Sequence, residues 1–321
     1  MQRSNGNRDI ALYAPRGYTL RQACSMNKVV ASFWSWDEFV AYCEEPIDVK
    51  FDARRRSRSN ANGHDESWWG CTDIHDACAQ ARRGWHRPNE FMGMVDNIEA
   101  LCAKALQFDV PHYDVTGAVP DVGLYLGGEP ECMIDFVSRE VAKPMFARIF
   151  VDSSVSWNVP VDVIQRRSAA IVALLDAVEF AGVRVDLDMG NVVRTSTGTQ
   201  SGSVMMPIIP VKACDEPLDI DLLNFAMVSA ASSRMLGFSM RERLFDPATE
   251  WSKWRMHDGN YCYPLGEIDE YPLDCDLIMP GLNSGSIYSR IFSSDTETVK
   301  WIKETAANLT QAQLAPDMAT D

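Results

Sequence analysis

Residues 152 to 156, DSSVS, place one carboxylate and two hydroxyls on a short turn, directly after an apolar segment and directly before a helix start. Asp152, Ser154 and Ser156 are all oxygen donors, and oxygen ligands are what a hard divalent cation such as Mg²⁺ prefers. Aspartate and serine are also common where helices begin, because their side chains accept hydrogen bonds from the amides of the first turn. The turn is therefore either a metal site or a helix entry.

The segments around this turn predict where it lies in the fold. MFARIFV, residues 145–151, is strand-like, and residues 160–181 have the spacing of a long helix that begins at Pro160 and stops at Gly182. VRVDLDM, residues 183–189, alternates apolar and charged residues, which predicts a half-exposed strand. A strand, a helix and a second strand form a right-handed crossover, and sites in such sheets lie at the carboxyl ends of the strands. The DSSVS turn lies at such an end.

The remaining pattern indicates an α/β protein with a helical N-terminal region. VMMPIIPV, residues 204–211, contains two prolines that cannot donate to a ladder, so we expect an edge strand there. Capping boxes at SWDE (35–38) and SDTE (294–297) predict the starts of two helices. Further segments are predicted as strands at 132–136 and 276–281, and as helices at 72–84, 90–108 and 217–236.

The turn and its neighbours resemble the von Willebrand factor A fold over residues 130–240. In that fold the metal-ion-dependent adhesion site begins with Asp-x-Ser-x-Ser at the same junction of strand and helix, which DSSVS matches. The family pattern also needs a threonine on a second loop and an aspartate at the end of a later central strand. The resemblance implies that Thr195, Thr197 or Thr199 supplies the threonine, with Thr197 in the metal set, and that Asp188 is the nearest substitute for the aspartate.

A second resemblance covers more of the chain. Segments such as FWSWDEFVAYCEEP, DVGLYLGGEPECM and EPLDIDLLNFAMVSAASSRMLGF are similar to an uncharacterised family of tailed-bacteriophage proteins, catalogued as a domain of unknown function. That family keeps the strand before the serine-containing turn but does not uniformly keep the acid at Asp152. The resemblance implies a phage origin and action in the cytoplasm of the infected host cell.

A basic and aromatic segment, FDARRRSRSNANGHDESWWG, gives an alternative function. Its arginines would contact phosphates and its tryptophans would stack on bases, as in proteins that bind single-stranded nucleic acid. The other interpretation is a solvated loop, because small and polar residues dominate the segment. The residues that would carry nucleic-acid binding are Arg54, Arg55, Arg56, Arg58, Trp68 and Trp69.

Composition narrows the function further. The 321 residues are 46% hydrophobic and 23% charged, which are globular proportions, and the net charge of −15 disfavours general attraction to nucleic acid or an anionic membrane. Nine scattered cysteines without a CxxC pair indicate reduced thiols in a cytoplasm. No segment has the apolar length of a signal peptide or membrane span, and no Walker, GxSxG or HExxH motif occurs.

The sequence thus predicts an α/β fold, Rossmann-like and von Willebrand factor A-like, with a mixed sheet and helices on both faces. We expect a helical N-terminal region at 1–125 with a basic loop at 52–70, an α/β domain at 126–310, and a flexible tail at 311–321. The expected function is non-catalytic binding of another phage or host protein, with Mg²⁺ as the candidate ion. The alternative is a single-stranded nucleic-acid-binding cofactor in phage replication or transcription. A metal-dependent hydrolase using Asp152 and Asp188 lacks a general base with a motif around it.

Overall fold

The structure of the chain is a computed structural model. It describes residues 19–20, 28–45, 70–84, 112–115, 119–120, 122–135, 145–156, 158–194, 204–244, 264–265, 267–268, 271 and 273–314. The predicted helix at 90–108 and the basic loop at 52–70 lie outside these residues, apart from Gly70.

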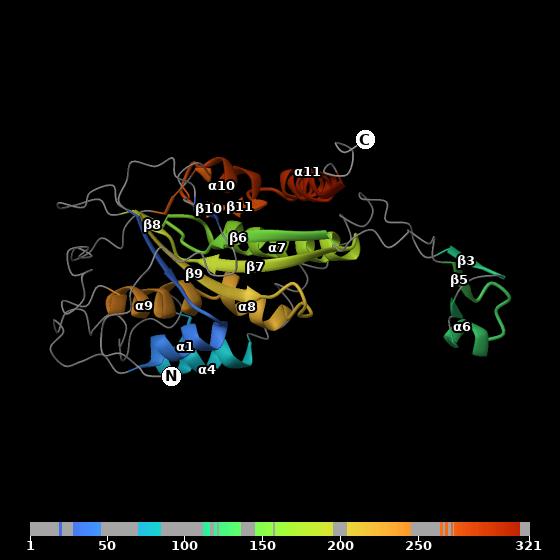
Figure 1. The fold of residues 1–321 in the computed structure, drawn as a ribbon, viewed down its shortest axis with the longest axis horizontal. Coiled ribbons are helices and arrows are strands. Elements are labelled where there is room, and N and C mark those ends of the chain that lie inside the picture. The colour runs from blue at the N-terminus through green and yellow to red at the C-terminus, as the bar shows by residue number, and fades with distance from the viewer. Residues whose placement is uncertain are drawn as a thin grey trace.

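A mixed sheet forms the centre of the molecule (Figure 1). Four of its strands have the order β9-β7-β6-β11, and β6 runs parallel to both β7 and β11, whereas β9 runs antiparallel to β7. The predicted mixed α/β architecture is confirmed at this level. The strands of the full sheet are β11 (Leu277–Met279), β6 (Met145–Asp152), β7 (Val183–Gly190), β9 (Val204–Lys212) and β2 (Lys28–Ser32), with the short β8 (Val193–Arg194) also paired to β9.

The prediction that residues 204–211 form an edge strand is wrong. β9 lies inside the sheet, because β2 pairs with its first half while β7 pairs with its second half. Pro210 is tolerated because it falls at the register shift between β7 and β9, where the ladder is already irregular. The N-terminal segment that contains β2 is therefore part of the main sheet.

Helices pack on one face of this sheet. α7 (Val161–Phe180) connects β6 to β7 as predicted, with Pro160 before it and Gly182, at φ 90°, after it. The helix predicted at 217–236 is interrupted: α8 ends at Ser229, and a π-helical stretch precedes α9. The other helices of the C-terminal half are α8 (Ile220–Val228), the π-helix (Ala231–Leu236), α9 (Gly237–Leu244), α10 (Ile287–Ile291) and α11 (Asp295–Leu314).

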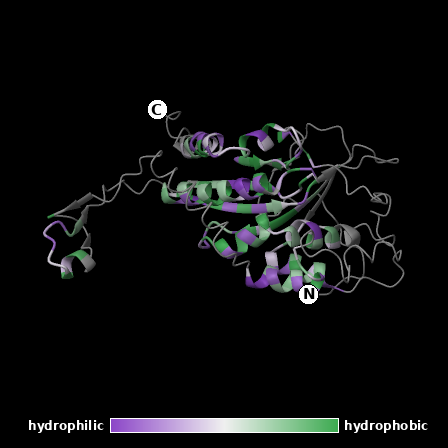
Figure 2. Cartoon of the chain, turned by 180° about the vertical axis from the view of Figure 1, so that it is seen from behind, coloured by the Kyte–Doolittle hydropathy of each residue, from purple (hydrophilic) through white to green (hydrophobic). Residues whose placement is uncertain are grey.

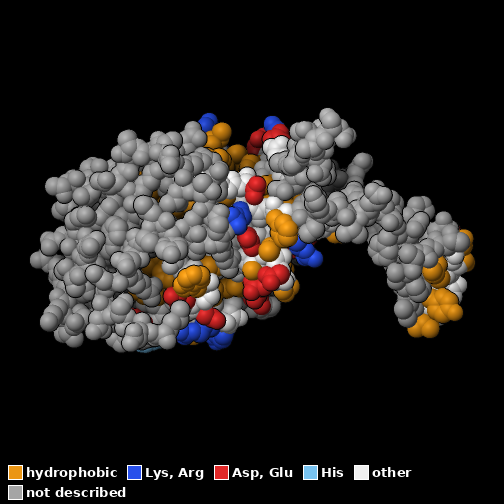
Figure 3. Space-filling view, viewed as in Figure 1, with side chains coloured by type: hydrophobic (Ala, Val, Ile, Leu, Met, Phe, Trp, Pro, Cys, Tyr) orange, Lys and Arg blue, Asp and Glu red, His pale blue; other side chains and the backbone are white. Residues whose placement is uncertain are grey.

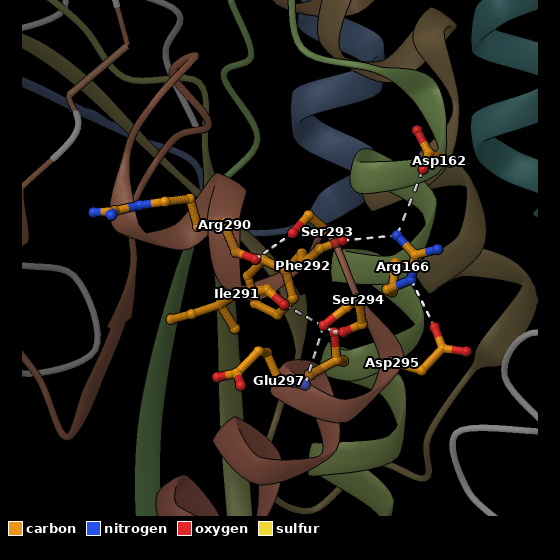
Figure 4. A network of polar contacts seen from close by, with 10 residues as sticks. Asp162, Arg166, Arg290, Ile291, Phe292, Ser293, Ser294, Asp295 and Glu297 are labelled. Carbon is orange, nitrogen blue, oxygen red and sulfur yellow. Dashed lines mark hydrogen bonds and ion pairs between the residues drawn. The ribbon is translucent and has the colours of Figure 1, made fainter.

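Hydrogen bonds of Arg166 connect α7 to the start of α11. Arg166 donates from Nε to Asp295 Oδ1 at 2.8 Å and from Nη1 to the carbonyl oxygen of Phe292 at 2.8 Å. Figure 4 shows Arg166 between Asp295 and Asp162, its neighbour one turn earlier on α7. The predicted helix start at Ser294 is confirmed, because α11 begins at Asp295 and the amide of Glu297 donates to Ser294 Oγ at 3.4 Å, which is one of the two hydrogen bonds of a capping box.

The N-terminal helices belong to the same core as the sheet. α1 (Trp36–Glu44) is capped by Ser35, as predicted, and α4 (Ile74–Arg83) is capped by Asp73, one residue after the predicted start. Trp36 Nε1 donates to the carbonyl oxygen of Ala81 at 2.9 Å, which joins the two helices. Both helices contribute to the large hydrophobic cluster that includes α7 and the sheet.

The two faces of the sheet pack against different hydrophobic clusters. Ile149, Val185 and Ile209 face the cluster that contains the helices, and Phe150 and Ile208 face a second, smaller cluster. No described helix contributes to this second cluster, so the predicted helices on both faces are found on one face only within the described residues. Figure 2 shows hydrophobic residues both in the central strands and in the helices beside them. The second cluster is instead closed by Leu265, Tyr271 and Leu273.

The amino half of the second face carries charged side chains together with the exposed Phe146. Arg148 and Asp186 lie 3.9 Å apart there, and Arg184 is exposed beside them. Figure 3 shows acidic and basic side chains next to one another in the middle of this view. The cover formed by Leu265, Tyr271 and Leu273 is thus confined to the carboxyl half of the face.

Two smaller sheets complete the described structure. β5 (Met133–Asp135) pairs with β3 (His112–Asp114) and β4 (Val119–Pro120), next to the short helix α6 (Val122–Leu126), and Figure 1 shows this unit apart from the main sheet. β1 (Thr19–Leu20) pairs with β10 (Leu273–Asp274). Among the helices that the structure describes, none has both the length and the apolar character needed to cross a membrane.

Candidate functional site at the carboxyl end of the sheet

Asp152 is the last residue of β6 and is completely buried. Its Oδ1 accepts hydrogen bonds from the amides of Ser154 at 2.9 Å and Val192 at 3.0 Å. Its Oδ2 accepts a hydrogen bond from the Tyr271 hydroxyl at 2.6 Å. The carboxylate therefore joins β6, the end of β7 and the cover of the second face.

The serines of the turn have different environments. Ser153 Oγ donates to the carbonyl oxygen of Gly190 at 2.8 Å. Ser154 is buried, and its Oγ has no hydrogen-bond partner within the described part of the chain. Ser156 is half-buried, and its amide donates to the carbonyl oxygen of Leu282 at 2.8 Å, so the turn is anchored to the segment after β11. Only Ser156 reaches the rim of the site.

A buried cation lies beside the turn. Arg167, on α7, donates from Nη2 to the carbonyl oxygens of Asp152 at 2.9 Å, Pro280 at 3.0 Å and Met279 at 3.3 Å. These acceptors are at the carboxyl ends of two neighbouring strands. A guanidinium in this place holds the end of β6 against the end of β11.

Burial dominates the electrostatics of the site. Burial raises the pKa of Asp152, whereas the hydrogen bond from Tyr271, the nearby Ser154 hydroxyl and the hydrogen bonds from the amides of Ser154 and Val192 oppose that shift. Burial also raises the pKa of Tyr271 well above its usual value, and the neighbouring carboxylate adds to the effect. Burial lowers the pKa of Arg167, whereas attraction to Asp152 raises it. Tyr271 therefore acts as a neutral hydrogen-bond donor at physiological pH.

The backbone of Gly281 packs closely against the turn. A β-carbon at this residue would lie 2.5 Å from Ser154 Oγ, 2.8 Å from Pro264 Cβ and 2.9 Å from Asp152 Oδ2. Only glycine lets the segment after β11 approach so closely. The two oxygens therefore face one small region, next to the amide that Gly281 donates to the Tyr271 hydroxyl at 2.9 Å.

These oxygens fit a divalent cation in part. Ser154 Oγ is a buried oxygen without a hydrogen-bond partner in the described chain, and Asp152 Oδ2 faces the same region. The donor type suits Mg²⁺. Tyr271, however, holds the carboxylate oxygen that an ion would need, and Arg167 adds a positive charge nearby. Within the described ranges, no group of three or more His, Cys, Asp or Glu side chains is arranged to hold a metal ion.

Asp188, which the resemblance put in the metal set, does not lie level with Asp152 in the sheet. Asp188 is buried on β7 and is the ladder partner of Phe150, whereas Asp152 is the partner of Gly190, so Asp188 lies two residues nearer the amino ends on the same face. The prediction of a half-exposed strand holds only for the start of β7, because its carboxyl half is buried under the second cluster. β11 ends at Met279 and is followed by Pro280 and Gly281, so no acid directly follows this strand, which is also an edge strand of the described sheet.

Several predicted site residues lie outside the described residues. They are Thr197 and its neighbours Thr195 and Thr199, and the six residues of the nucleic-acid alternative, Arg54, Arg55, Arg56, Arg58, Trp68 and Trp69. Nucleic-acid binding through this segment stays a prediction.

Two residues of the site were not predicted from the sequence. The sequence does contain one indication of Arg167. This residue interrupts the apolar stripe of α7 between Ile164 and Ile171, and a charged side chain is expected at such a buried position only if it is paired. The sequence contains no indication of Tyr271, because this residue lies in an irregular aromatic-rich segment. Its hydrogen bond with Asp152, 119 residues earlier, depends on the tertiary fold.

Comparisons with known proteins agree with the coarse prediction of an uncharacterised family. Neither a curated protein nor a solved structure matches the chain. One family model, described as a domain of unknown function (DUF7192), matches residues 10–297, which include the central sheet, α7 and the Asp152 turn. The chain belongs to the DUF7192 family of domains of unknown function.

Proposed function

We propose that the chain is a non-catalytic protein–protein interaction module of bacteriophage origin with a von Willebrand factor A-like fold. It would act in the cytoplasm of the host cell and bind another phage or host protein. The strand order supports the fold assignment, since β9 follows the crossover and runs antiparallel to β7, as the resemblance implies. The Asp-x-Ser-x-Ser turn also lies at the expected junction, between β6 and α7.

One observation carries the proposal: the ends of β6, β7 and β11 are joined around Asp152, and Ser156 is at the rim of this junction. Loops at the carboxyl ends of strands are where sheets of this type bind ligands. The Arg167 and Tyr271 contacts hold the junction rigid, and a rigid surface loses little conformational entropy when a partner binds. The partner would contact the turn at Ser156 and the segment after β11.

A divalent cation would be held by Asp152, Ser154 and Ser156. When bound, Mg²⁺ would supply a coordination position for an acidic side chain of the partner. Ser154 Oγ supports this part of the proposal, because burial of a hydroxyl without a partner costs free energy unless a ligand satisfies it.

The non-catalytic assignment rests on the environment of Asp152, the acid that the described residues place at the junction. Asp152 accepts three hydrogen bonds and is fully buried, an environment typical of a carboxylate that supports structure. As long as these three hydrogen bonds are kept, the carboxylate does not accept a substrate proton, which general base catalysis requires.

A thermal-shift titration tests the cation. A ligand that binds only the folded state raises the melting temperature, so millimolar Mg²⁺, Mn²⁺ or Ca²⁺ should raise it in the wild-type protein. The shift should be lost in Ser154→Ala. Ser293→Ala, which removes an exposed hydroxyl that donates to the carbonyl oxygen of Arg290, should keep the full shift. Equal shifts in the two variants would contradict the cation site.

Affinity capture from infected cells tests the partner. The wild-type protein should retain a specific phage or host protein, identified by mass spectrometry. Ser156→Arg, which places a long cation on the rim, should lose it, and Ser293→Arg should not. Retention of the same protein by both variants would place the interaction elsewhere on the molecule.

A further inference from the structure

We infer that the Tyr271 hydroxyl is an internal competitor for Asp152, so that any cation or partner group that binds Asp152 must first displace it. This inference rests on the proposed function, because it concerns access to the same site. The Tyr271 hydroxyl would thus control whether a ligand reaches the Asp152 carboxylate.

The competition follows from how the two carboxylate oxygens are occupied. Oδ1 is held by the amides of Ser154 and Val192, which belong to the turn itself and to the end of β7. Neither amide leaves without unfolding the local backbone. Among the described residues, the hydrogen bond to Oδ2 comes from the side-chain hydroxyl of Tyr271, at 2.6 Å. Oδ2 is therefore the oxygen that an external ligand reaches by moving a side chain instead of the backbone.

Tyr271 has a second acceptor that makes the exchange feasible. Its hydroxyl lies 3.1 Å from the carbonyl oxygen of Leu265 as well as 2.6 Å from Asp152 Oδ2, and one hydroxyl proton serves only one of them at a time. When a ligand takes Oδ2, the hydroxyl donates to Leu265 instead. The buried hydroxyl thus keeps a partner in both states, which avoids the cost of an unsatisfied polar group.

The change of hydrogen-bond partner by Tyr271 also affects the residues that cover the second face of the sheet. The Tyr271 ring is fully buried, with its centroid 6.1 Å from that of Phe150, and its oxygen accepts the amide proton of Gly281 at 2.9 Å. A ligand that displaces the hydroxyl from Asp152 therefore also disturbs the hydrogen bond from Gly281. Ligand binding at Asp152 therefore changes the hydrogen bonding of the segment after β11, which is the segment proposed to contact the partner.

The test compares Mn²⁺ binding, read as bound ion by electron paramagnetic resonance, in the wild-type protein and in Tyr271→Phe. This substitution removes the competing hydroxyl and keeps the ring against Phe150. Because a hydrogen bond to a charged group is worth a factor of about 10 to 100, Tyr271→Phe should bind Mn²⁺ at least about 10-fold more tightly. Tyr125→Phe removes an exposed phenol on α6, which lies apart from the main sheet in Figure 1, and should bind as the wild type does. In Tyr271→Phe/Asp152→Asn the gain should disappear.

The possible results distinguish two questions: whether Tyr271 competes for Asp152, and whether the cation site exists. Equal affinity in the wild type and Tyr271→Phe, with loss in Asp152→Asn, would overturn the competitor and leave the cation site intact. Binding in neither protein would overturn both. If Tyr271→Phe does not fold, as judged by circular dichroism, hydrogen exchange of the wild-type protein decides: Mn²⁺ should speed exchange of the Gly281 amide. Unchanged or slower exchange at bound Mn²⁺ would overturn the inference.

Discussion

The guanidinium of Arg167 lies 2.9 Å from the carbonyl oxygen of Asp152, and the same Nη2 atom is 3.0 Å from the carbonyl oxygen of Pro280. One side chain of α7 therefore binds the ends of two parallel strands. Arg167 is only 4% exposed, so its charge is stabilised by these carbonyls and by the nearby Asp152 carboxylate, not by water. The first prediction follows from this arrangement.

Arg167→Met should destabilise the protein by about 3 kcal/mol, because it leaves a buried carboxylate without its neighbouring cation and several carbonyls without a donor. Urea denaturation measures the change in the free energy of unfolding. Arg290→Met, at an exposed position, should change it by less than about 0.5 kcal/mol. Similar stabilities for the two variants would show that Arg167 does not join the strands.

Gly281→Ala should destabilise the protein by about 1 to 3 kcal/mol through steric overlap, since the new β-carbon would contact Ser154 Oγ and Pro264 Cβ below 3.0 Å. Gly285→Ala is the comparison. Gly285 has φ +83° with no atom within 4 Å of the added carbon, so its cost of about 1 kcal/mol would come from backbone conformation alone. Thermal melting distinguishes the variants, and a smaller loss at Gly281 would contradict the close approach.

Arg166 should couple more strongly to Asp295 than to Asp162. The Asp295 contact is 2.8 Å and the Asp162 contact is 3.6 Å, although both acids are about half exposed or more, so water screens each pair. Double-mutant cycles with alanine should give about 0.5 to 1 kcal/mol for Arg166–Asp295 and about 0.3 kcal/mol for Arg166–Asp162. Equal coupling energies would mean that Arg166 gains little by joining α7 to α11.

Glu44 should make stability depend on pH through its contact with Arg82. The hydrogen bond from Arg82 lowers the pKa of Glu44 in the folded state, with a further contribution from His75. A lowered pKa contributes stability above the unfolded-state pKa, and that contribution is lost as the pH falls through the folded-state pKa.

The measurement is the difference in unfolding free energy between the wild type and Glu44→Gln, from pH 7 to pH 3. Because the pair is at the surface, we expect a difference of about 0.5 kcal/mol at pH 7. The difference should narrow toward pH 3, and 1 M salt should reduce it at pH 7. A difference that grows on acidification would show that the pKa of Glu44 is not lowered.

The local elements were predictable because their signals are local. The capping box at Ser35, the proline before α7 and the glycine after it are recognised from a few adjacent residues, and the structure places helix ends there. The alternation of Val183, Val185 and Leu187 likewise predicts a strand with one packed face. Even there, Glu38 reaches back to the amide of Trp34, a detail that depends on the path of the chain before the helix.

The sequence by itself determined that strand, turn and helix meet at Asp152, because those elements are consecutive and each is specified by nearby residues. Only the tertiary structure decided what surrounds the carboxylate. The position of β9 inside the sheet required β2, whose five residues pair with it from more than 170 positions away. The contacts of Asp152 with Val192, Tyr271 and the Arg167 charge join segments up to 119 residues apart. Such contacts leave no periodic pattern, because a single buried hydrogen bond fixes only two atoms, whereas a helix or strand repeats its requirement along many residues.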